Sequence, residues 1–516
     1  MVCEITGAAR NQSGYRVAAA RPGGLVDDER FGTSQGGAMS EAVTGQGAPD
    51  KQPELKRVMG PGLLLLFIVG DILGTGVYAL VGDVAGEVGG AAWLPFLIAF
   101  GVATITAFSY LELVTKYPQA AGAALYAHKA FGIQFITFLV AFVVMCSGIT
   151  SASTASRAFA ANFFEGVGTE ASKVGVAVLA LLFMAALAAI NYRGVGESVK
   201  LNVVLTIVEI TGLVVVILVG MWAFTGGGDV DFSRIVAFET AEDKSTFLAI
   251  SAATSLAFFA MVGFEDSVNM AEETKDPVKT FPKILLTGLS IAGVVYVLIS
   301  IVAVALVPIG KLEESDTPLV EVVRAGAPGL PIDTILPFIT MFAVSNTALI
   351  NMLMASRLIY GMARQRVLPS VLGTVHPTRR SPWVAILFTT VIAFGLIIYV
   401  STAASSNAIS VLGGTTSLLL LAVFAVVNVA VLVLRRDVRQ AGGHFKTPTA
   451  LPVIGFLTSL YLVTPLSGRP SQQYLVAGVL VAVGVVLFFV TQKINKQLGI
   501  RDARITDPTH LGSGPN

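Results

Sequence analysis

The sequence predicts an all-α integral membrane protein with twelve transmembrane helices, ten of which form two inverted repeats of five. Three observations lead to this fold class. Only 13% of the 516 residues are charged and 54% are hydrophobic, whereas about 25% of the residues in a soluble domain are charged. The apolar residues gather in runs of about 20 residues, which is long enough to cross a bilayer. The first and the sixth of these runs share an interruption by glycine and acidic residues.

The twelve spans follow one another through connections whose charges predict their orientation. Lysine and arginine gather in alternate connections, as they do in cytoplasmic loops. This pattern holds through all twelve spans only if both termini are cytoplasmic. We therefore expect a multi-pass protein of the plasma membrane. The predicted spans cover residues 59–84, 91–114, 131–163, 173–191, 198–224, 246–273, 281–307, 331–365, 382–400, 407–434, 449–467 and 473–492.

The first span contains the segment "IVGDILGTGVYALVG", residues 68–82, which is unfavourable for a membrane helix. It holds Gly70, Gly74 and Gly76 and the acid Asp71. Each glycine costs roughly 1 kcal/mol relative to alanine, and an acid near the bilayer centre costs roughly 2.5–3.5 kcal/mol. Unwound backbone is tolerated in a membrane only where it is buried in protein or lines a cavity. We therefore expect the helix to break near Gly74.

The sixth span has a similar defect, five spans later. Its sequence "SLAFFAMVGFEDSVNMAEE" begins apolar, reaches Gly263 and then becomes acidic. A second unit of five spans enters the membrane from the opposite side, so the two interruptions occupy corresponding positions of two inverted repeats. Such paired interruptions are the best sequence indication of a transporter's binding site at the midplane. The alternative is that both glycine clusters only allow close helix packing.

The two breaks predict complementary ends of a substrate. Where the first span restarts, free N–H groups and the helix dipole favour a carboxylate. Where the sixth span stops, carbonyl groups without helical partners favour an ammonium group. A carboxylate and an ammonium group together describe an α-amino acid, and the apolar lining favours a neutral side chain. The expected substrate-binding residues are Ile72, Gly74, Thr75, Gly76, Phe259, Ala260, Met261, Val262 and Gly263.

Several motifs, in this order along the chain, resemble the amino acid–polyamine–organocation (APC) superfamily of permeases. They are "GDILGTGVY", "KYPQAAGAALYAHKAFG", "FFAMVGFEDSVNMAEETKDPVKTFPKIL", "MASRLIYGMARQRVLPSVLGTVHPTRRSPWVAI" and "FKTPTALPVIGFLTSLYLV". The resemblance implies a LeuT-like 5+5 inverted repeat with two accessory helices, which moves its substrate by alternating access. It covers a transport core (56–435) and two accessory spans (436–495), while composition without periodicity predicts a disordered cytoplasmic tail before them (1–55) and a cytoplasmic C-terminal tail after them (496–516).

The fifth span departs from the family pattern at Glu209. Many proton-dependent relatives carry a lysine at this position, where sodium-coupled relatives hold an ion between the first, fifth and eighth spans. A carboxyl group here favours proton-coupled symport, with Asp71 as a second candidate. Ser345 and Asn346 of the eighth span offer oxygen atoms to a sodium ion instead. Structural roles remain as alternatives: a protonated Glu209 that bonds a neighbouring helix, an Asp71 that caps a half-helix, and packing hydrogen bonds of the eighth span.

Other functional classes find little support in the sequence. The chain has no nucleophile elbow, no HExxH sequence and no phosphate-binding loop, so we expect neither an enzyme nor a bound cofactor or metal. Its net charge of +1 argues against nucleic acid as a partner. A channel would need a pore ring and usually oligomeric symmetry. The expected partners are the lipid bilayer, an amino acid, and a proton or alternatively sodium. The second candidate is a polyamine or cationic amino acid exchanger, in which Asp71 or Glu209 holds a distal amine.

Overall fold

The computed structural model describes most of the chain between the two predicted tails. Its described residues form helices and turns and contain no β-strand, only two isolated bridges. Residues 1–55 and most of 496–516 lie outside the described part, so the predicted tails remain predictions. The described residues are 59–119, 122–170, 172–193, 198–227, 230–240, 244–271, 273–379, 381–403, 408–436 and 443–499.

Long apolar helices dominate the described residues, as predicted. Eleven helical segments are long and apolar enough to cross a membrane. Where the sequence predicts the eleventh span, the structure has the shorter apolar helix α15 (Ala450–Val463), which has only 14 residues and is followed by the short turn η8 (Pro465–Ser467). Nine of these segments each contain one long α-helix. They are α3 (Trp93–Lys116), α5 (Gln134–Gly166), α6 (Lys173–Arg193), α7 (Ser198–Trp222), α9 (Pro277–Leu306), α12 (Ile332–Arg364), α13 (Trp383–Ala403), α14 (Ala408–Leu434) and α16 (Ser471–Gln497).

Both interrupted spans are broken at the predicted glycines. The first consists of α1 (Pro61–Ile72) and α2 (Thr75–Val88), separated by Leu73 and Gly74. The sixth begins as α8 (Thr246–Ala257), tightens into η4 (Phe258–Met261) and then loses helical geometry at Val262 and Gly263. Gly263 has φ +121°, a value that side-chain-bearing residues rarely adopt. Beyond it, only the five-residue 3₁₀ turn η5 (Asp266–Met270) follows, so the second half of this span is not the α-helix that the sequence predicts.

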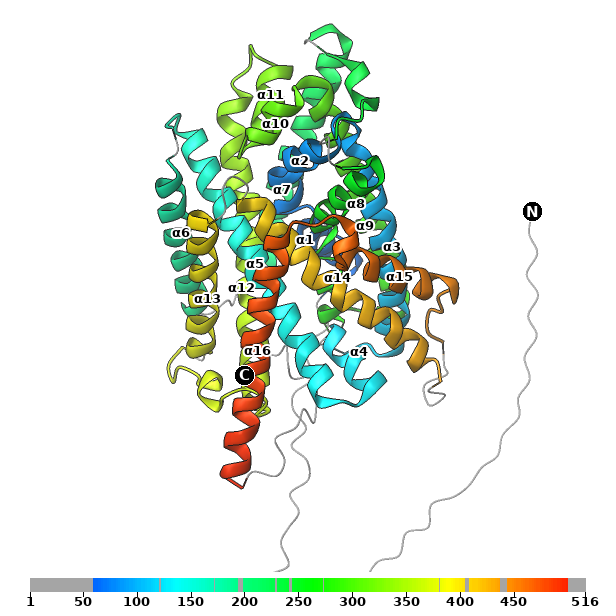
Figure 1. Ribbon diagram of the computed structural model, residues 1–516, viewed down its shortest axis with the longest axis vertical. Coiled ribbons are helices and arrows are strands. Elements are labelled where there is room, and N and C mark those ends of the chain that lie inside the picture. Colours follow the sequence, from blue (N-terminus) through cyan, green and yellow to red (C-terminus); the bar gives the residue numbers. More distant parts are fainter. Residues whose placement is uncertain are drawn as a thin grey trace, which may run out of the picture. The chain divides into compact units, whose positions relative to one another are not determined.

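The broken spans are the most enclosed of the membrane segments. Of the 18-residue apolar window in each span, 83% is buried inside the protein in the first span and 78% in the sixth, compared with 28% in α6 and 33% in α16. α1 packs against α7 and α9, while α2 packs against α8, and Figure 1 places these helices among α3, α5 and α14. Enclosure explains why unwound backbone is tolerated here, because it does not face lipid.

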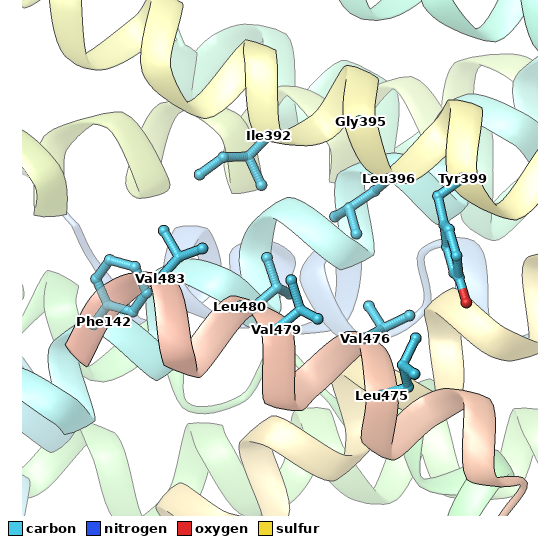
Figure 2. A pocket seen from close by; sticks show the side chains of 10 residues that line it. All are labelled: Phe142, Ile392, Gly395, Leu396, Tyr399, Leu475, Val476, Val479, Leu480 and Val483. Carbon is cyan, nitrogen blue, oxygen red and sulfur yellow. The ribbon is translucent and has the colours of Figure 1, made fainter. Parts of the chain in front are cut away.

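Two features lie away from the breaks. Figure 2 shows an apolar groove of about 310 Å³ between α13 and α16. Phe142 of α5 also lines it, and none of its lining residues belongs to either break, so it is not the predicted substrate site.

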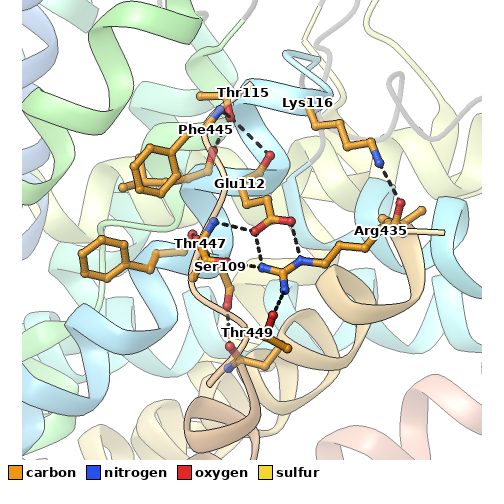
Figure 3. Close-up of polar contacts among 12 residues, drawn as sticks. Ser109, Glu112, Thr115, Lys116, Arg435, Phe445, Thr447 and Thr449 are labelled. Atoms are coloured by element: carbon orange, nitrogen blue, oxygen red, sulfur yellow. Dashed lines mark hydrogen bonds and ion pairs between the residues drawn. The ribbon is translucent and has the colours of Figure 1, made fainter. Parts of the chain in front are cut away.

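Figure 3 shows Arg435, just after α14, in a two-pronged ion pair with Glu112 of α3, at 2.7 and 2.6 Å. The Thr447 amide adds a bond of 2.8 Å to Glu112, which connects the segment before α15 to both helices.

Candidate functional site

The two breaks lie in direct contact with each other. A Cβ atom added at Gly76 would overlap the backbone of Ala260 and lie 2.7 Å from the Ala260 Cβ. A Cβ at Gly263 would lie 2.8 Å from the carbonyl carbon and oxygen of Asp71. Only glycine permits either approach. The structure therefore brings together the two groups of residues to which the sequence assigns the carboxylate and the ammonium group.

Two other helices approach the first break through its remaining glycines. A Cβ at Gly70 would lie 2.8 Å from the Cβ of Thr206 in α7, and one at Gly74 would overlap the hydroxyl of Thr347 in α12. These are the fifth and eighth spans, between which the sequence places the coupling ion. Thr206 and Thr347 are buried and their hydroxyls have no partner among the described residues. Sequence reasoning missed both, because a threonine in a membrane helix is common and carries no pattern of its own.

The start of α2 has the features of an anion-binding helix end. Gly74 precedes it, and no side chain caps its first N–H groups. The first N–H groups of any α-helix lack intrahelical partners. Thr75 is 1% exposed, and its hydroxyl is also without a partner among the described residues. Backbone and side-chain donors therefore converge at the end where the helix dipole is positive.

The end of α8 presents acceptors instead. The Phe258 N–H bonds to Thr254 and Leu256, and the Val262 N–H donates to the Phe259 carbonyl at 3.3 Å. A carbonyl oxygen has two lone pairs, so the Phe259 oxygen keeps capacity for a second donor. The Gly263 N–H donates to the Glu265 carboxylate at 2.9 Å. This role of Glu265 was not predicted.

Tyrosine hydroxyls satisfy two carbonyls near the site. Tyr296 of α9 donates to the carbonyl of Ile72, the last residue of α1. Tyr78 of α2 donates to the backbone carbonyl of Glu209 at 2.9 Å. Neither tyrosine was predicted as a site residue. The first bond connects α9 to the end of α1, and the second connects α2 to α7. Both bonds therefore help to hold the two halves of the first span in position.

The two intramembrane acids are deeply buried and unpaired. Glu209 is 0% exposed and Asp71 is 5% exposed. Both oxygens of Glu209 and one of Asp71 have no hydrogen-bond partner among the described residues, and neither acid forms an ion pair there. The charged groups that act on Asp71 are the acids Asp266, Glu265 and Glu209. Unpaired charge at this depth is costly, and proton binding removes it.

The eighth-span candidates differ from each other. The Ser345 hydroxyl donates to the Met341 carbonyl of its own helix at 2.6 Å, which is neither an ion contact nor a bond to a neighbouring helix. The Asn346 oxygen accepts from Asn202 of α7 at 3.3 Å, while its amide nitrogen has no partner among the described residues. Asn346 therefore joins the fifth and eighth spans, and Thr347 rather than Ser345 contacts the break.

A polar pocket of about 360 Å³ lies on the α2 side of the breaks. It extends from α10 (Ile309–Glu314) to Ala79, which is three residues and so about one helical turn beyond Gly76. Its acidic lining includes Asp83 and Asp316. Burial raises the pKa of Asp316, and the Arg157 guanidinium partly opposes that shift. The pocket is a candidate access route to the breaks from this side.

Comparison with known proteins assigns the chain to a family. The sequence model of the amino acid permease family matches residues 63–494, which include both breaks and Glu209. The chain belongs to the amino acid permease family. Among similar proteins are the methylthioribose transporter of Bacillus subtilis, 26% identical over 87% of this permease and 96% of the relative, and the branched-chain amino acid permease BcaP of the same organism, 23% identical over the same shares. The chloroplastic cationic amino acid transporter 9 of Arabidopsis thaliana is 28% identical over 63% of this permease and 58% of the relative.

The family confirms the resemblance to APC permeases and the general class of function. This permease is a multi-pass membrane protein from a family of transporters rather than of enzymes. These relatives are named as transporters of methylthioribose, branched-chain amino acids and cationic amino acids. Identities of 23–28% with proteins of such different substrates leave the side chain of the substrate to be argued from the site.

Proposed function

We propose that this permease moves an α-amino acid across the cell membrane by alternating access, with a proton as the coupled ion. The observation that carries the proposal is the contact between the two breaks, where Gly76 lies against Ala260. A small zwitterion bound beside this contact can reach the start of α2 and the end of α8 together. A single intact helix offers its amide end and its carbonyl end far apart, whereas two broken helices offer both at one point.

The carboxylate of the substrate binds the amides of Gly74, Thr75 and Gly76. The uncapped start of α2 supports this role, since the dipole there stabilises an anion by about 0.3–2 kcal/mol. The Thr75 hydroxyl adds a further donor. The ammonium group binds the carbonyls of Phe259, Ala260 and Val262, which lie where α8 loses its helical geometry.

The side chain of the substrate lies against apolar groups. Phe259 and Met261 are buried at the break, and Ile72 lies on its other side at the end of α1. This lining favours a neutral, apolar side chain over a charged one. Cationic amino acids and polyamines are the competing substrates, and they belong in the same uptake screen.

Glu209 carries the proton. Its carboxyl group is fully buried on α7, lacks a partner among the described residues, and lies on the helix whose Thr206 meets Gly70 at the first break. Protonation from one side and release to the other would couple its charge to movement of the first span. Symport of a zwitterion with one proton moves one net charge, so 100 mV supplies about 2.3 kcal/mol and each pH unit about 1.4 kcal/mol. Together they support an accumulation of roughly 500-fold.

Uptake into proteoliposomes tests the substrate. We expect accumulation of a neutral amino acid driven by an inward pH gradient or potential without sodium, and weak binding of its methyl ester, which lacks the carboxylate. Equal affinity for the acid and its ester would contradict the carboxylate site at α2.

A variant of Glu209 tests the coupling. Glu209→Gln keeps the size of the side chain but cannot bind a proton, so it should lose accumulation driven by a pH gradient and retain exchange of substrate for substrate. Asp71→Asn serves as the matched comparison, because Asp71 is the second candidate. An absolute requirement for sodium, or a Glu209→Gln variant that still concentrates substrate with the original pH profile, would refute the proton assignment to Glu209.

A further inference from the structure

A buried arginine connects the accessory spans to the break of the sixth span. Arg469 lies between α15 and α16 and is only 7% exposed. The preceding residue, Gly468, has φ +79°, and a Cβ there would lie 3.0 Å from Leu248 and 3.3 Å from Ala252 of α8. The turn η8 also packs against α8. The connection therefore rests on the half-helix that leads to the break, and the guanidinium points inward rather than to water.

The guanidinium makes five hydrogen bonds, all to neutral acceptors. Two are local: Nε donates to the Leu462 carbonyl at 2.7 Å, and Nη1 to the Gln473 side chain at 3.0 Å. The other three leave the accessory spans, and they reach the carbonyls of Gly414 (2.9 Å) and Ser255 (3.2 Å) and the hydroxyl of Ser417 (2.9 Å). An arginine has five N–H donors in a rigid fork, so this set uses its full capacity.

One of these bonds ends on a carbonyl beside the substrate site. Ser255 lies three residues before Phe258, where α8 tightens into η4. Its carbonyl accepts from Arg469 and also from the Ser417 hydroxyl of α14, at 2.5 Å. On the same stretch of α14, a Cβ at Gly413 would lie 3.6 Å from the ring of Phe259. The arginine thus joins α8 and α14 within about one turn of the carbonyls that the proposed function assigns to the ammonium group.

The buried charge has a cost that a purely structural contact would avoid. Burial lowers the pKa of Arg469 to about 9, and no carboxylate pairs with it among the described residues. An uncharged residue would fill this space without desolvating an ion. The benefit is geometric: a planar fork fixes the distance between two helices more narrowly than a flexible apolar contact does.

We propose that Arg469 is a positioning residue, through which the α15–α16 pair holds the end of α8 against α14 and so sets the geometry of the ammonium end of the substrate site. This inference rests on the proposed function. It assigns to the accessory spans a part in substrate affinity, although they contribute no residue to either break. Arg469 touches no substrate and acts through Ser255.

The test compares substrate affinity in three purified variants reconstituted into proteoliposomes. Arg469→Lys keeps the positive charge but has three donors on a flexible stem, so we expect the KM for uptake to rise roughly fivefold or more, with a smaller change in maximal rate. Ser417→Ala removes one acceptor of the fork and one donor to Ser255, and should raise KM in the same direction by less. Arg435→Lys is the matched control. It weakens another arginine network, the partly buried one with Glu112 on α3, and should lower the melting temperature without changing KM.

The outcomes separate positioning from a general structural role. An unchanged KM in monodisperse Arg469→Lys overturns the proposal, and so does a KM that rises equally in Arg435→Lys. If Arg469→Lys fails to fold, Ser417→Ala decides by the same criterion, because it removes only a hydroxyl. Failure of the proposed function is recognised separately: the methyl ester would then compete as well as the acid in the unmodified protein, whatever the arginine variants do.

Discussion

The contact between Gly76 and Ala260 gives the sharpest test of the site, because its geometry sets a magnitude. The Cβ added by Gly76→Ala would lie 2.7 Å from the Ala260 Cβ and closer still to the Ala260 Cα, whereas ordinary contact begins at 3.4 Å. The obstacle is backbone, which cannot rotate away, so the two breaks must separate by about 0.7 Å or more. A misplacement of about 1 Å in a site that depends on orientation can cost on the order of 100-fold. We expect Gly76→Ala to lower uptake efficiency by roughly tenfold to 100-fold.

A series of glycines supplies the controls. Gly62 lies in the same span with nothing within 4 Å of an added Cβ, so Gly62→Ala should transport normally. The Cβ added by Gly74→Ala would overlap the hydroxyl of Thr347 and lie 3.3 Å from the Thr347 Cβ. Because a side chain can move aside more easily than backbone, Gly74→Ala should lower uptake efficiency less than Gly76→Ala does. The double change Gly74→Ala with Thr347→Ala removes the obstructing hydroxyl and should recover part of the loss, as expected for residues in contact.

The assay is initial uptake by purified protein in liposomes, with size-exclusion chromatography and a melting temperature for each variant. These measurements separate loss of binding from loss of folding. A monodisperse Gly76→Ala protein with the original KM and rate would refute the argument, since the breaks would then not need their observed proximity. An equal loss in Gly62→Ala would refute it as well, because the effect would then belong to any glycine of the span.

Two further predictions concern orientation and the distant ion pair. If the charges of the connections set the topology, cysteines introduced in residues 230–240 should be labelled from outside intact cells. Cysteines introduced in residues 366–379 should be labelled only after permeabilisation, and the reverse result would overturn the predicted cytoplasmic termini. Glu112→Gln leaves Arg435 without its charged partner, and because the Glu112 side chain is 3% exposed and that of Arg435 17%, we expect a loss of stability of roughly 3 kcal/mol, measured as a lower melting temperature. An unchanged melting temperature would show that the network in Figure 3 contributes little.

Membrane spans and breaks could be predicted from the sequence because they depend on local composition. A run of apolar residues is needed to cross a bilayer, and glycine beside an acid is unfavourable wherever it stands in such a run. The C-terminal end of α15 could also have been predicted from the sequence, but our prediction placed it too late in the chain. The helix was expected to reach residue 467 and ends at Val463, because Pro465 disfavours helical geometry at Thr464 and cannot donate a backbone hydrogen bond.

The partners of the site were not predictable in the same way. Thr206 and Thr347 matter because α7 and α12 bring them to Gly70 and Gly74, and no local pattern reports contacts between residues more than 100 positions apart. Tyr296 and Arg469 illustrate the same limit. An arginine near the end of a membrane helix is usually expected to extend to the membrane surface, yet Arg469 turns inward, because the backbone carbonyls of α8 and α14 offer it acceptors.

The sequence left two explanations open for the glycines of the first span, helix breaking and close packing, and the structure shows both. Four of the glycines along this span each meet a different element: Gly70 meets α7, Gly74 meets α12, Gly76 meets η4, and Gly82 meets the Leu312 carbonyl of α10. Only Gly74 lies at the break itself. The others let neighbouring elements approach the backbone, and that approach offsets a helical cost of about 1 kcal/mol for each glycine. A span that moves between states must be able to leave these contacts, and contacts made by backbone hydrogens can separate without first withdrawing an interlocked side chain. In the proposed alternating-access cycle, these close backbone contacts would let the broken span shift against each of these neighbours.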